Sequence, residues 1–269
     1  MAENWGQQVI VEAKPGAGSI VATEYVAKAA PDGYNIVIVP TSFALNPSLY
    51  RKLPYDSLRN LVPVVLIGTQ PTLLVVHPAV PVKSVRDLIA LAKSKPGQLN
   101  YASSGVGSGG FLAAELFKKI SRVNMVHIPY KGPGPALIEL LAGQIDMLFT
   151  SPLAALPHVK TGRLRAVAVT SSKRAVDLPD IPTVAESGLP GYEVLVWNVL
   201  LSPGGTPSAI INKISSDFTA VLQSPDVKAR LRSSGFDARG GTPEECLAFV
   251  QSEMEKWSKV IVEAGIDPI

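Results

Sequence analysis

The sequence has few of the residues on which disulfides, metal centres and base-stacking surfaces depend. Its single cysteine, Cys246, excludes an internal disulfide and is expected to be a packing residue in the last helix. Its three histidines, His77, His127 and His158, have no partner at metal-ligand spacing. Aromatic residues make up 6% of the chain, too few to form stacking platforms for bases. We therefore expect no metal and no cofactor.

Charge of one sign is not concentrated anywhere in the chain. The 25 basic and 22 acidic residues give a net charge of +3, and the basic residues are scattered. A nucleic-acid-binding surface would cluster them, so we expect no nucleic-acid partner. No apolar run approaches the length of a membrane span. With 46% hydrophobic residues in 269, the chain can form one large or two ordinary globular domains.

Apolar strand-like segments alternate with helical segments along most of the chain. Strands are predicted over 8–13, 34–40, 61–68, 73–77, 99–103, 124–129, 146–149, 165–169 and 192–202. Ser84 and Thr242 each precede a helical pattern and have an acidic residue three positions later, as helix caps do. This order predicts an α/β fold whose sheets are mostly parallel and covered by helices.

The stretch 99–117 carries the strongest signal for a binding site. A strand leads through a glycine-serine turn into a helix that is expected to begin near Phe111. Gly105 and Gly107 let the backbone approach a ligand, and the helix start offers free N–H groups and the positive end of the helix dipole. Hydroxyl donors are added by Ser103, Ser104 and Ser108. The turn is therefore suited to hold a small anion without a cationic side chain.

Two other interpretations of this turn stay open. The segment from Gly105 to Gly110 matches the G-x-G-x-x-G pattern of dinucleotide sites, which makes a nucleotide-binding α/β enzyme the alternative. That site also needs an acidic residue at the end of the next strand, where the chain has none. The glycines also suit a tight turn without any ligand. No G-x-S-x-G elbow presents a nucleophile, and His127 is expected to be a hydrogen-bonded core residue, so we expect no enzyme.

Small and hydroxyl residues also follow other predicted strands, whose carboxyl ends are where ligands bind in open α/β sheets. Beyond the central turn, the candidates are Tyr130, Lys131, Gly132, Thr150 and Ser151. Nearer the start of the chain they are Gly16, Gly18, Thr41, Ser42 and Asn46. Trp197 is a candidate pocket wall. Taken singly, each has an ordinary alternative role as a cap, a turn residue or part of the core.

Several longer motifs occur in order over essentially the whole chain. They include Val11-Glu-Ala-Lys-Pro-Gly-Ala-Gly18, Tyr101-Ala-Ser-Ser-Gly-Val-Gly-Ser108, His127-Ile-Pro-Tyr-Lys-Gly132, Pro182-Thr-Val-Ala-Glu-Ser-Gly188 and Pro203-Gly-Gly-Thr-Pro207. In these motifs the chain resembles the extracytoplasmic solute receptors of tripartite tricarboxylate transporters, the Bug or TctC family.

The resemblance implies a two-domain, periplasmic-binding-protein-like fold of type II with a hinge. The first, discontinuous lobe would comprise 1–101 and 203–269, and the second 102–202. A small organic carboxylate (a di- or tricarboxylate, an amino acid or an aromatic acid) would bind in the interdomain cleft, largely through main-chain amides and water. The receptor would be periplasmic and would deliver its ligand to the permease subunits in the membrane.

The resemblance also implies a departure at the start of the chain. Family members normally begin with a signal peptide, a first strand and a proline- and glycine-rich loop that forms one jaw of the carboxylate site. Here Met1 falls where the following helix is expected. We therefore expect an N-terminally shortened chain with no signal peptide and with an unpaired sheet edge, and a binding-impaired remnant stays an alternative.

Overall fold

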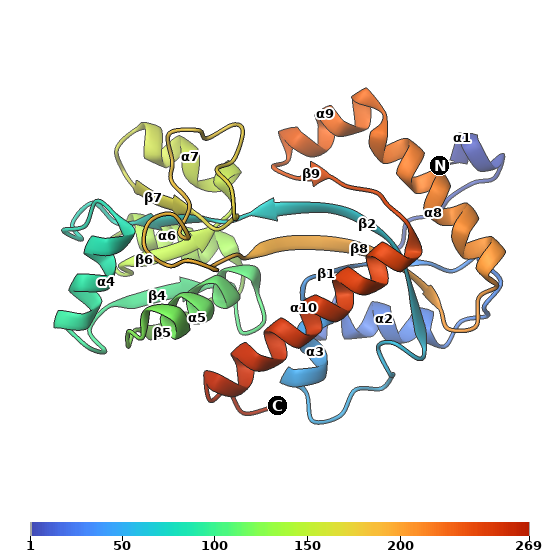
Figure 1. The fold of residues 1–269 in the computed structure, drawn as a ribbon, viewed down its shortest axis with the longest axis horizontal. Coiled ribbons are helices and arrows are strands. Elements are labelled where there is room, and N and C mark those ends of the chain that lie inside the picture. The colour runs from blue at the N-terminus through green and yellow to red at the C-terminus, as the bar shows by residue number, and fades with distance from the viewer. Residues whose placement is uncertain (1, 269) are drawn as a thin grey trace. The chain divides into compact units, whose positions relative to one another are not determined.

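The computed structural model describes residues 2–268 and divides the chain into two compact units. Unit 1 comprises the residues up to Thr69 and those from Trp197 onwards, and unit 2 comprises Gln70–Val196 (Figure 1). Each unit contains one sheet with helices against it. None of the helices in the described residues combines the length and apolarity needed to cross a membrane.

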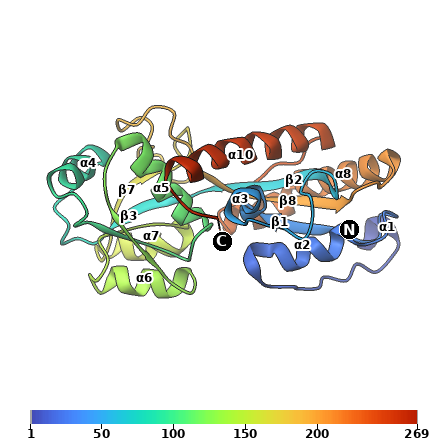
Figure 2. The ribbon, with the colours of Figure 1, turned by 90° about the horizontal axis from the view of Figure 1, so that it is seen from below.

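Unit 1 is built on a sheet with the strand order β1-β8-β2-β9. Its elements are α1 (Ala2–Trp5), the 3-10 turn η1 (Ala17–Ser19), α2 (Ile20–Ala27), β1 (Val37–Pro40), α3 (Ser42–Leu49), β2 (Leu61–Pro71), β8 (Leu195–Pro203), α8 (Ser208–Gln223), α9 (Pro225–Ser233), β9 (Asp237–Ala238) and α10 (Pro243–Glu263). Helices α10 and α2 lie on opposite sides of this sheet (Figure 2). Strands β2 and β8 carry the chain between the units.

Unit 2 is built on a sheet with the strand order β5-β4-β6-β3-β7. Its elements are β3 (Leu73–Val76), α4 (Val85–Ser94), β4 (Asn100–Ser103), α5 (Gly109–Ser121), β5 (Val126–Pro129), α6 (Pro133–Leu141), β6 (Met147–Thr150), α7 (Pro152–Lys160) and β7 (Arg165–Val169). Strand β4 is parallel to both β5 and β6, whereas β3 is antiparallel to β6 and β7. Helices α5 and α6 lie on opposite sides of the sheet (Figure 2).

The prediction of mostly parallel sheets is correct for β4, β5 and β6 but wrong for β1, β3 and β9. Strand β1 is antiparallel to β8, and β9 is antiparallel to β2. Parallel neighbours require a crossover connection, usually a helix. Strand β3 follows β2 with only Thr72 between them, and β8 enters unit 1 from unit 2, so neither strand has such a crossover before it.

The boundaries between the units also differ from those expected for the two lobes. Residues 70–101 lie in unit 2 rather than in the first lobe, because β3 pairs with β6 and β7 inside that sheet. Residues 197–202 lie in unit 1, where β8 pairs with β1. The chain therefore leaves unit 1 along β2, two strands earlier than the expected crossing in β4.

Local signals for helices were more reliable than those for strands. The Ser84 hydroxyl accepts from the amide of Asp87 at 3.1 Å, and Thr242 forms a capping box with Glu245, both as predicted. The predicted strand over 8–13 pairs with no strand among the described residues, and its Ile10 and Val11 are 80% and 91% exposed. A strand exists only where a neighbour takes up its backbone hydrogen bonds, and β1 is an edge strand that this segment does not reach.

Two glycines at the start of α5 allow the helix to approach the sheet closely. A Cβ atom on Gly110 would lie 2.5 Å from the carbonyl oxygen of Phe149 in β6, and one on Gly109 would lie 2.5 Å from Val196 Cγ2. The following turns of α5 bury Phe111, Leu112, Ala113, Ala114, Leu116 and Phe117. This packing holds the start of α5 against the carboxyl end of β6.

Replacing Gly110 with alanine is therefore expected to destabilise the protein by about 1–3 kcal/mol, because the backbone of Phe149 cannot move aside. Urea unfolding followed by circular dichroism measures the change. Gly134→Ala in α6 is the matched control, since nothing lies within 4 Å of its added Cβ atom. Equal stability of the two variants would contradict the close-packing argument.

Candidate functional site

Three helices begin at one edge of the sheet in unit 2. Because β5, β4 and β6 are adjacent and parallel, their carboxyl ends lie together, with Ser103 opposite Pro129 in the pairing of β4 with β5. Helices α6, α5 and α7 follow these three strands in turn. The predicted convergence of the three strand ends is thus confirmed. It brings together the candidates Ser103, Ser104, Gly105, Gly107, Ser108, Tyr130, Lys131, Gly132, Thr150 and Ser151.

The turn between β4 and α5 is held from beneath by Ser103. The buried Ser103 hydroxyl accepts from the amide of Gly105 at 3.1 Å and lies 2.7 Å from Nε2 of His127. Gly105 and Gly107 have φ values of +111° and +82°, a region in which other residues are strained. Ser103 therefore supports the turn from inside, while Ser104 is exposed at its surface.

Several amides of this turn are left open. In the part of the chain that the structure describes, the amides of Ser104, Val106 and Gly107 donate no hydrogen bond. The Ser108 amide donates to the carbonyl of Gly105 at 3.2 Å, and the Ser108 hydroxyl caps α5 by accepting from the amide of Phe111 at 3.3 Å. Open amides at a helix N-terminus favour an anion, as the sequence predicts for this turn.

His127 is part of the support for the turn. Its ring stacks on Tyr101, with centroids 4.9 Å apart, and lies 4.9 Å from the ring of Phe111. Burial lowers the pKa of His127 and the Lys118 ammonium adds to this, while the Glu115 carboxylate opposes it. His127 is hydrogen bonded, as expected, but it is half-buried on the edge strand β5 rather than part of the core. Since Ser103 has no exposed surface, the Ser103–His127 pair offers no accessible nucleophile.

The starts of α6 and α7 offer fewer donors than the start of α5. Neither helix has a side-chain cap, and each begins with a proline, which has no N–H. The Ser151 hydroxyl already accepts from Gln70 Nε2 at 3.2 Å, and Thr150 is buried. Tyr130 packs against the apolar core, whereas Lys131 is exposed. The turn between β4 and α5 is thus the strongest anion-binding candidate in unit 2.

The candidates of unit 1 form a second group around η1. Ala17, Gly18 and Ser19 all have left-handed backbone angles, and the carbonyl of Gly18 accepts from Ser42 Oγ at 2.9 Å and from Asn46 Nδ2 at 3.1 Å. These bonds hold the exposed turn that Gly16 begins against the first turns of α3. Asn46 is buried, so it acts on this turn from inside.

Thr41 and Trp197 lie beneath the surface of unit 1. The Thr41 hydroxyl accepts from the amide of Trp197 at 3.0 Å, and both side chains are buried. The indole of Trp197 packs edge-on against Phe249, with ring centroids 5.5 Å apart. Trp197 was expected as a pocket wall, but in this structure its ring has no exposed surface for a ligand to touch.

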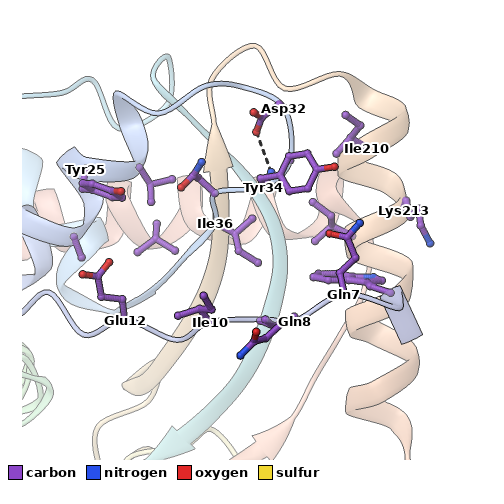
Figure 3. A pocket seen from close by; sticks show the side chains of 18 of the residues that line it. Gln7, Gln8, Ile10, Glu12, Tyr25, Asp32, Tyr34, Ile36, Ile210 and Lys213 are labelled. Atoms are coloured by element: carbon purple, nitrogen blue, oxygen red, sulfur yellow. Dashed lines mark hydrogen bonds between the residues drawn. The ribbon is translucent and has the colours of Figure 1, made fainter. Parts of the chain in front are cut away.

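A separate groove of about 890 Å³ lies in unit 1, between the segment around Ile10 and the chain that enters β1 (Figure 3). Its lining is largely apolar and contains none of the candidate residues. The two ammonium groups in the lining are already paired, Lys14 with Glu12 at 3.0 Å and Lys213 with Asp217 at 2.9 Å. The groove is therefore poorly suited to an anion.

The described residues contain no cluster of three or more His, Cys, Asp or Glu side chains that could hold a metal ion. Cys246 is buried, and burial raises the pKa of its thiol to about 12. A thiol with so high a pKa is protonated at neutral pH and is a poor nucleophile. Cys246 is thus a packing residue, as expected.

Comparison with known proteins decides the family. The sequence model of the family described as "Tripartite tricarboxylate transporter family receptor" matches residues 1–266. The chain belongs to this family.

Solved structures of related proteins support the same conclusion. The chain is 36% identical to Rpa4515 of R. palustris, solved with adipate, with a TM-score of 0.86 and coverage of 100% of this chain and 90% of that one. It is 31% identical to the periplasmic binding protein BugD (TM-score 0.82, coverage 100% and 90%). It is also 31% identical to MatC of Rhodopseudomonas palustris, solved with malate (TM-score 0.80, coverage 97% and 90%). These likenesses confirm the expected periplasmic-binding-protein-like fold.

The lowered pKa of His127 predicts a pH-dependent stability. The unfolded chain binds a proton near the ordinary histidine pKa of 6.5, whereas folded His127 resists protonation, so stability is lost as the pH falls below about 6.5. One such group changes the free energy of unfolding by at most about 1.4 kcal/mol per pH unit, and this is the slope that His127 contributes. Urea unfolding between pH 7.5 and 5 measures it.

His127→Gln is expected to remove this slope, because glutamine does not titrate. Gln144→Asn, which exchanges two side chains that do not titrate at an exposed position, serves as the control and should keep the slope of the parent chain. A parent protein of constant stability over this range would contradict the assigned environment of His127.

Proposed function

We propose that this protein is a solute-binding receptor that captures a small organic carboxylate for a tripartite tricarboxylate-type transporter. The observation that carries the proposal is the turn between β4 and α5, where open amides of Ser104, Val106 and Gly107 precede the start of α5. Membership of the receptor family supports it, as do the relatives solved with adipate and malate.

The chemistry of the turn suits a carboxylate. Each carboxylate oxygen accepts several hydrogen bonds, and neutral amides at a helix N-terminus supply them without a buried cation. The hydroxyls of Ser104 and Ser108 are the side-chain donors in the proposal, with Lys131 and the amide of Gly132 as companions at the same sheet edge. Amides recognise the carboxylate group itself, so the rest of the ligand decides between di- and tricarboxylates, amino acids and aromatic acids.

The unit 1 group is also among the proposed ligand-binding residues. Gly16, Gly18 and Ser42 lie around the η1 turn, and Thr41 and Asn46 support them from inside. Such a receptor performs no reaction. In this proposal it works in the periplasm and delivers the bound acid to the permease subunits in the membrane.

Thermal melting with adipate, malate, citrate, aspartate and benzoate tests the proposal directly. A ligand that binds only the folded state should stabilise it by about 2.7 kcal/mol at a hundredfold excess over Kd. ATP and NAD belong to the same panel, because a shift with a nucleotide alone would favour the α/β enzyme instead. A cooperative melt that no carboxylate shifts would refute the receptor.

Gly107→Val is expected to weaken binding of the active acid by about tenfold or more, because valine at a φ of +82° distorts the amide cradle and removes charge-assisted hydrogen bonds. Isothermal titration calorimetry measures the Kd. Gly162→Val is the matched control: Gly162 has a φ of +71° in unit 2 but lies in the turn after α7. The control should bind within about twofold of the parent. Parent-like binding by Gly107→Val would place the ligand elsewhere, and equal losses in the two variants would show a general disturbance of unit 2 instead of a local effect on the site.

A further inference from the structure

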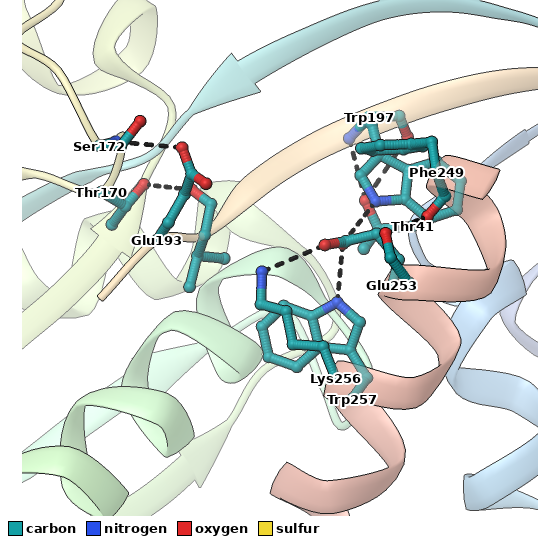
Figure 4. A network of polar contacts seen from close by, with 11 residues as sticks. Thr41, Thr170, Ser172, Glu193, Trp197, Phe249, Glu253, Lys256 and Trp257 are labelled. Atoms are coloured by element: carbon teal, nitrogen blue, oxygen red, sulfur yellow. Dashed lines mark hydrogen bonds and ion pairs between the residues drawn. The ribbon is translucent and has the colours of Figure 1, made fainter. Parts of the chain in front are cut away.

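Glu253 of α10 is a buried carboxylate placed between two tryptophan side chains. Its Oε2 atom accepts from Trp197 Nε1 at 2.8 Å and from Trp257 Nε1 at 2.9 Å (Figure 4). Its Oε1 atom lies 3.1 Å from the ammonium of Lys256, and the residue is 8% exposed. Burying a carboxylate costs free energy even when it is hydrogen bonded. An apolar side chain of similar size would therefore stabilise the core at least as well as Glu253 does.

The carboxylate holds the residue at which β8 enters unit 1. Trp197 is the first residue of unit 1 after the crossover from unit 2. Its side chain is held by Glu253, while its amide donates to the Thr41 hydroxyl at 3.0 Å. The next residue along β8, Asn198, lies opposite Pro40 in β1. Trp197 is therefore fixed through both its indole and its backbone.

Thr41 connects Trp197 to the start of α3. The Thr41 hydroxyl accepts from the amide of Trp197, and Thr41 makes no capping hydrogen bond to α3. One residue later, Ser42 donates to the carbonyl of Gly18, and Asn46 donates to the same oxygen. Hydrogen bonds, together with the peptide bond between Thr41 and Ser42, thus join Glu253 to the exposed turn of η1.

We propose that Glu253 is a positioning residue for ligand binding: through Trp197 and Thr41 it sets the place of Ser42 and of the Gly16–Ser19 turn. The proposal rests on the proposed receptor function. Glu253 itself touches no ligand, since it is buried among tryptophan side chains. Its effect is on the geometry of the ligand contacts in unit 1, separate from its effect on stability.

Three variants separate positioning from stability. Glu253→Leu removes the acceptor for both indoles, whereas Glu253→Gln keeps one oxygen that both indoles can reach. Trp257→Phe removes the other donor to Oε2 but leaves the bond from Trp197. Calorimetry with adipate and with malate, well below the lowest melting midpoint, gives the Kd of each variant.

Glu253→Leu is expected to weaken binding about tenfold, as for a residue that acts on a site through its neighbours. Glu253→Gln and Trp257→Phe should bind within about threefold of the parent, although Trp257→Phe loses stability by creating a cavity. Equal weakening by Trp257→Phe and Glu253→Leu would show a general loosening of α10 and overturn the proposal. Parent-like binding by Glu253→Leu would overturn it as well.

A ligand-free measurement keeps this proposal distinct from the receptor function. If the parent binds neither acid, the receptor function fails for these probes, and amide hydrogen exchange followed by NMR decides the role of Glu253. Glu253→Leu should then speed exchange of the Trp197 amide at least about tenfold. The Trp5 indole, bonded to Asp217 at 2.7 Å, should stay unchanged. Unchanged exchange at Trp197 would overturn the proposal.

Discussion

The candidate site depends on the parallel pairing of β4 with β5 and β6. Parallel neighbours end at the same edge of a sheet, and each of these strands is followed directly by a helix. This arrangement alone brings three helix starts together. The differences between them then come from local sequence: prolines remove donors at the starts of α6 and α7, while glycine and serine leave donors open before α5.

Hydrogen bonds from buried and partly buried side chains hold the exposed turns of both units. In unit 2, the neutral imidazole of His127 and the hydroxyl of Ser103 lie under the β4–α5 turn. In unit 1, Thr41, Ser42 and Asn46 connect the core to the η1 turn. Buried polar groups must be paired to be tolerated, so these bonds also restrict the turns to one geometry. A binding surface made of main-chain amides needs such support, because amides cannot be reoriented by choosing a rotamer.

The sequence does not tell whether a hydroxyl or amide side chain near a strand end supports a turn from inside or faces solvent. Ser103 and Ser104 are neighbours of the same type, yet one has no exposed surface and the other faces solvent. The alternation of side chains along a strand predicts that one of them points inward, but it does not tell which. Asn46 is ambiguous in the same way: the segment after β1 forms α3, which turns the Asn46 side chain towards the carbonyl of Gly18.

The sequence by itself determined the α/β class, most element positions, the helix caps at Ser84 and Thr242, and the glycine-serine turn before α5. These features depend on contacts between residues close in the chain, which local patterns record. Only the tertiary structure decided the direction of β3, the boundary at Thr69 and the burial of Trp197. Those features depend on pairings between distant segments, such as Leu73 with Thr150 or Glu253 with Trp197, which no local pattern encodes.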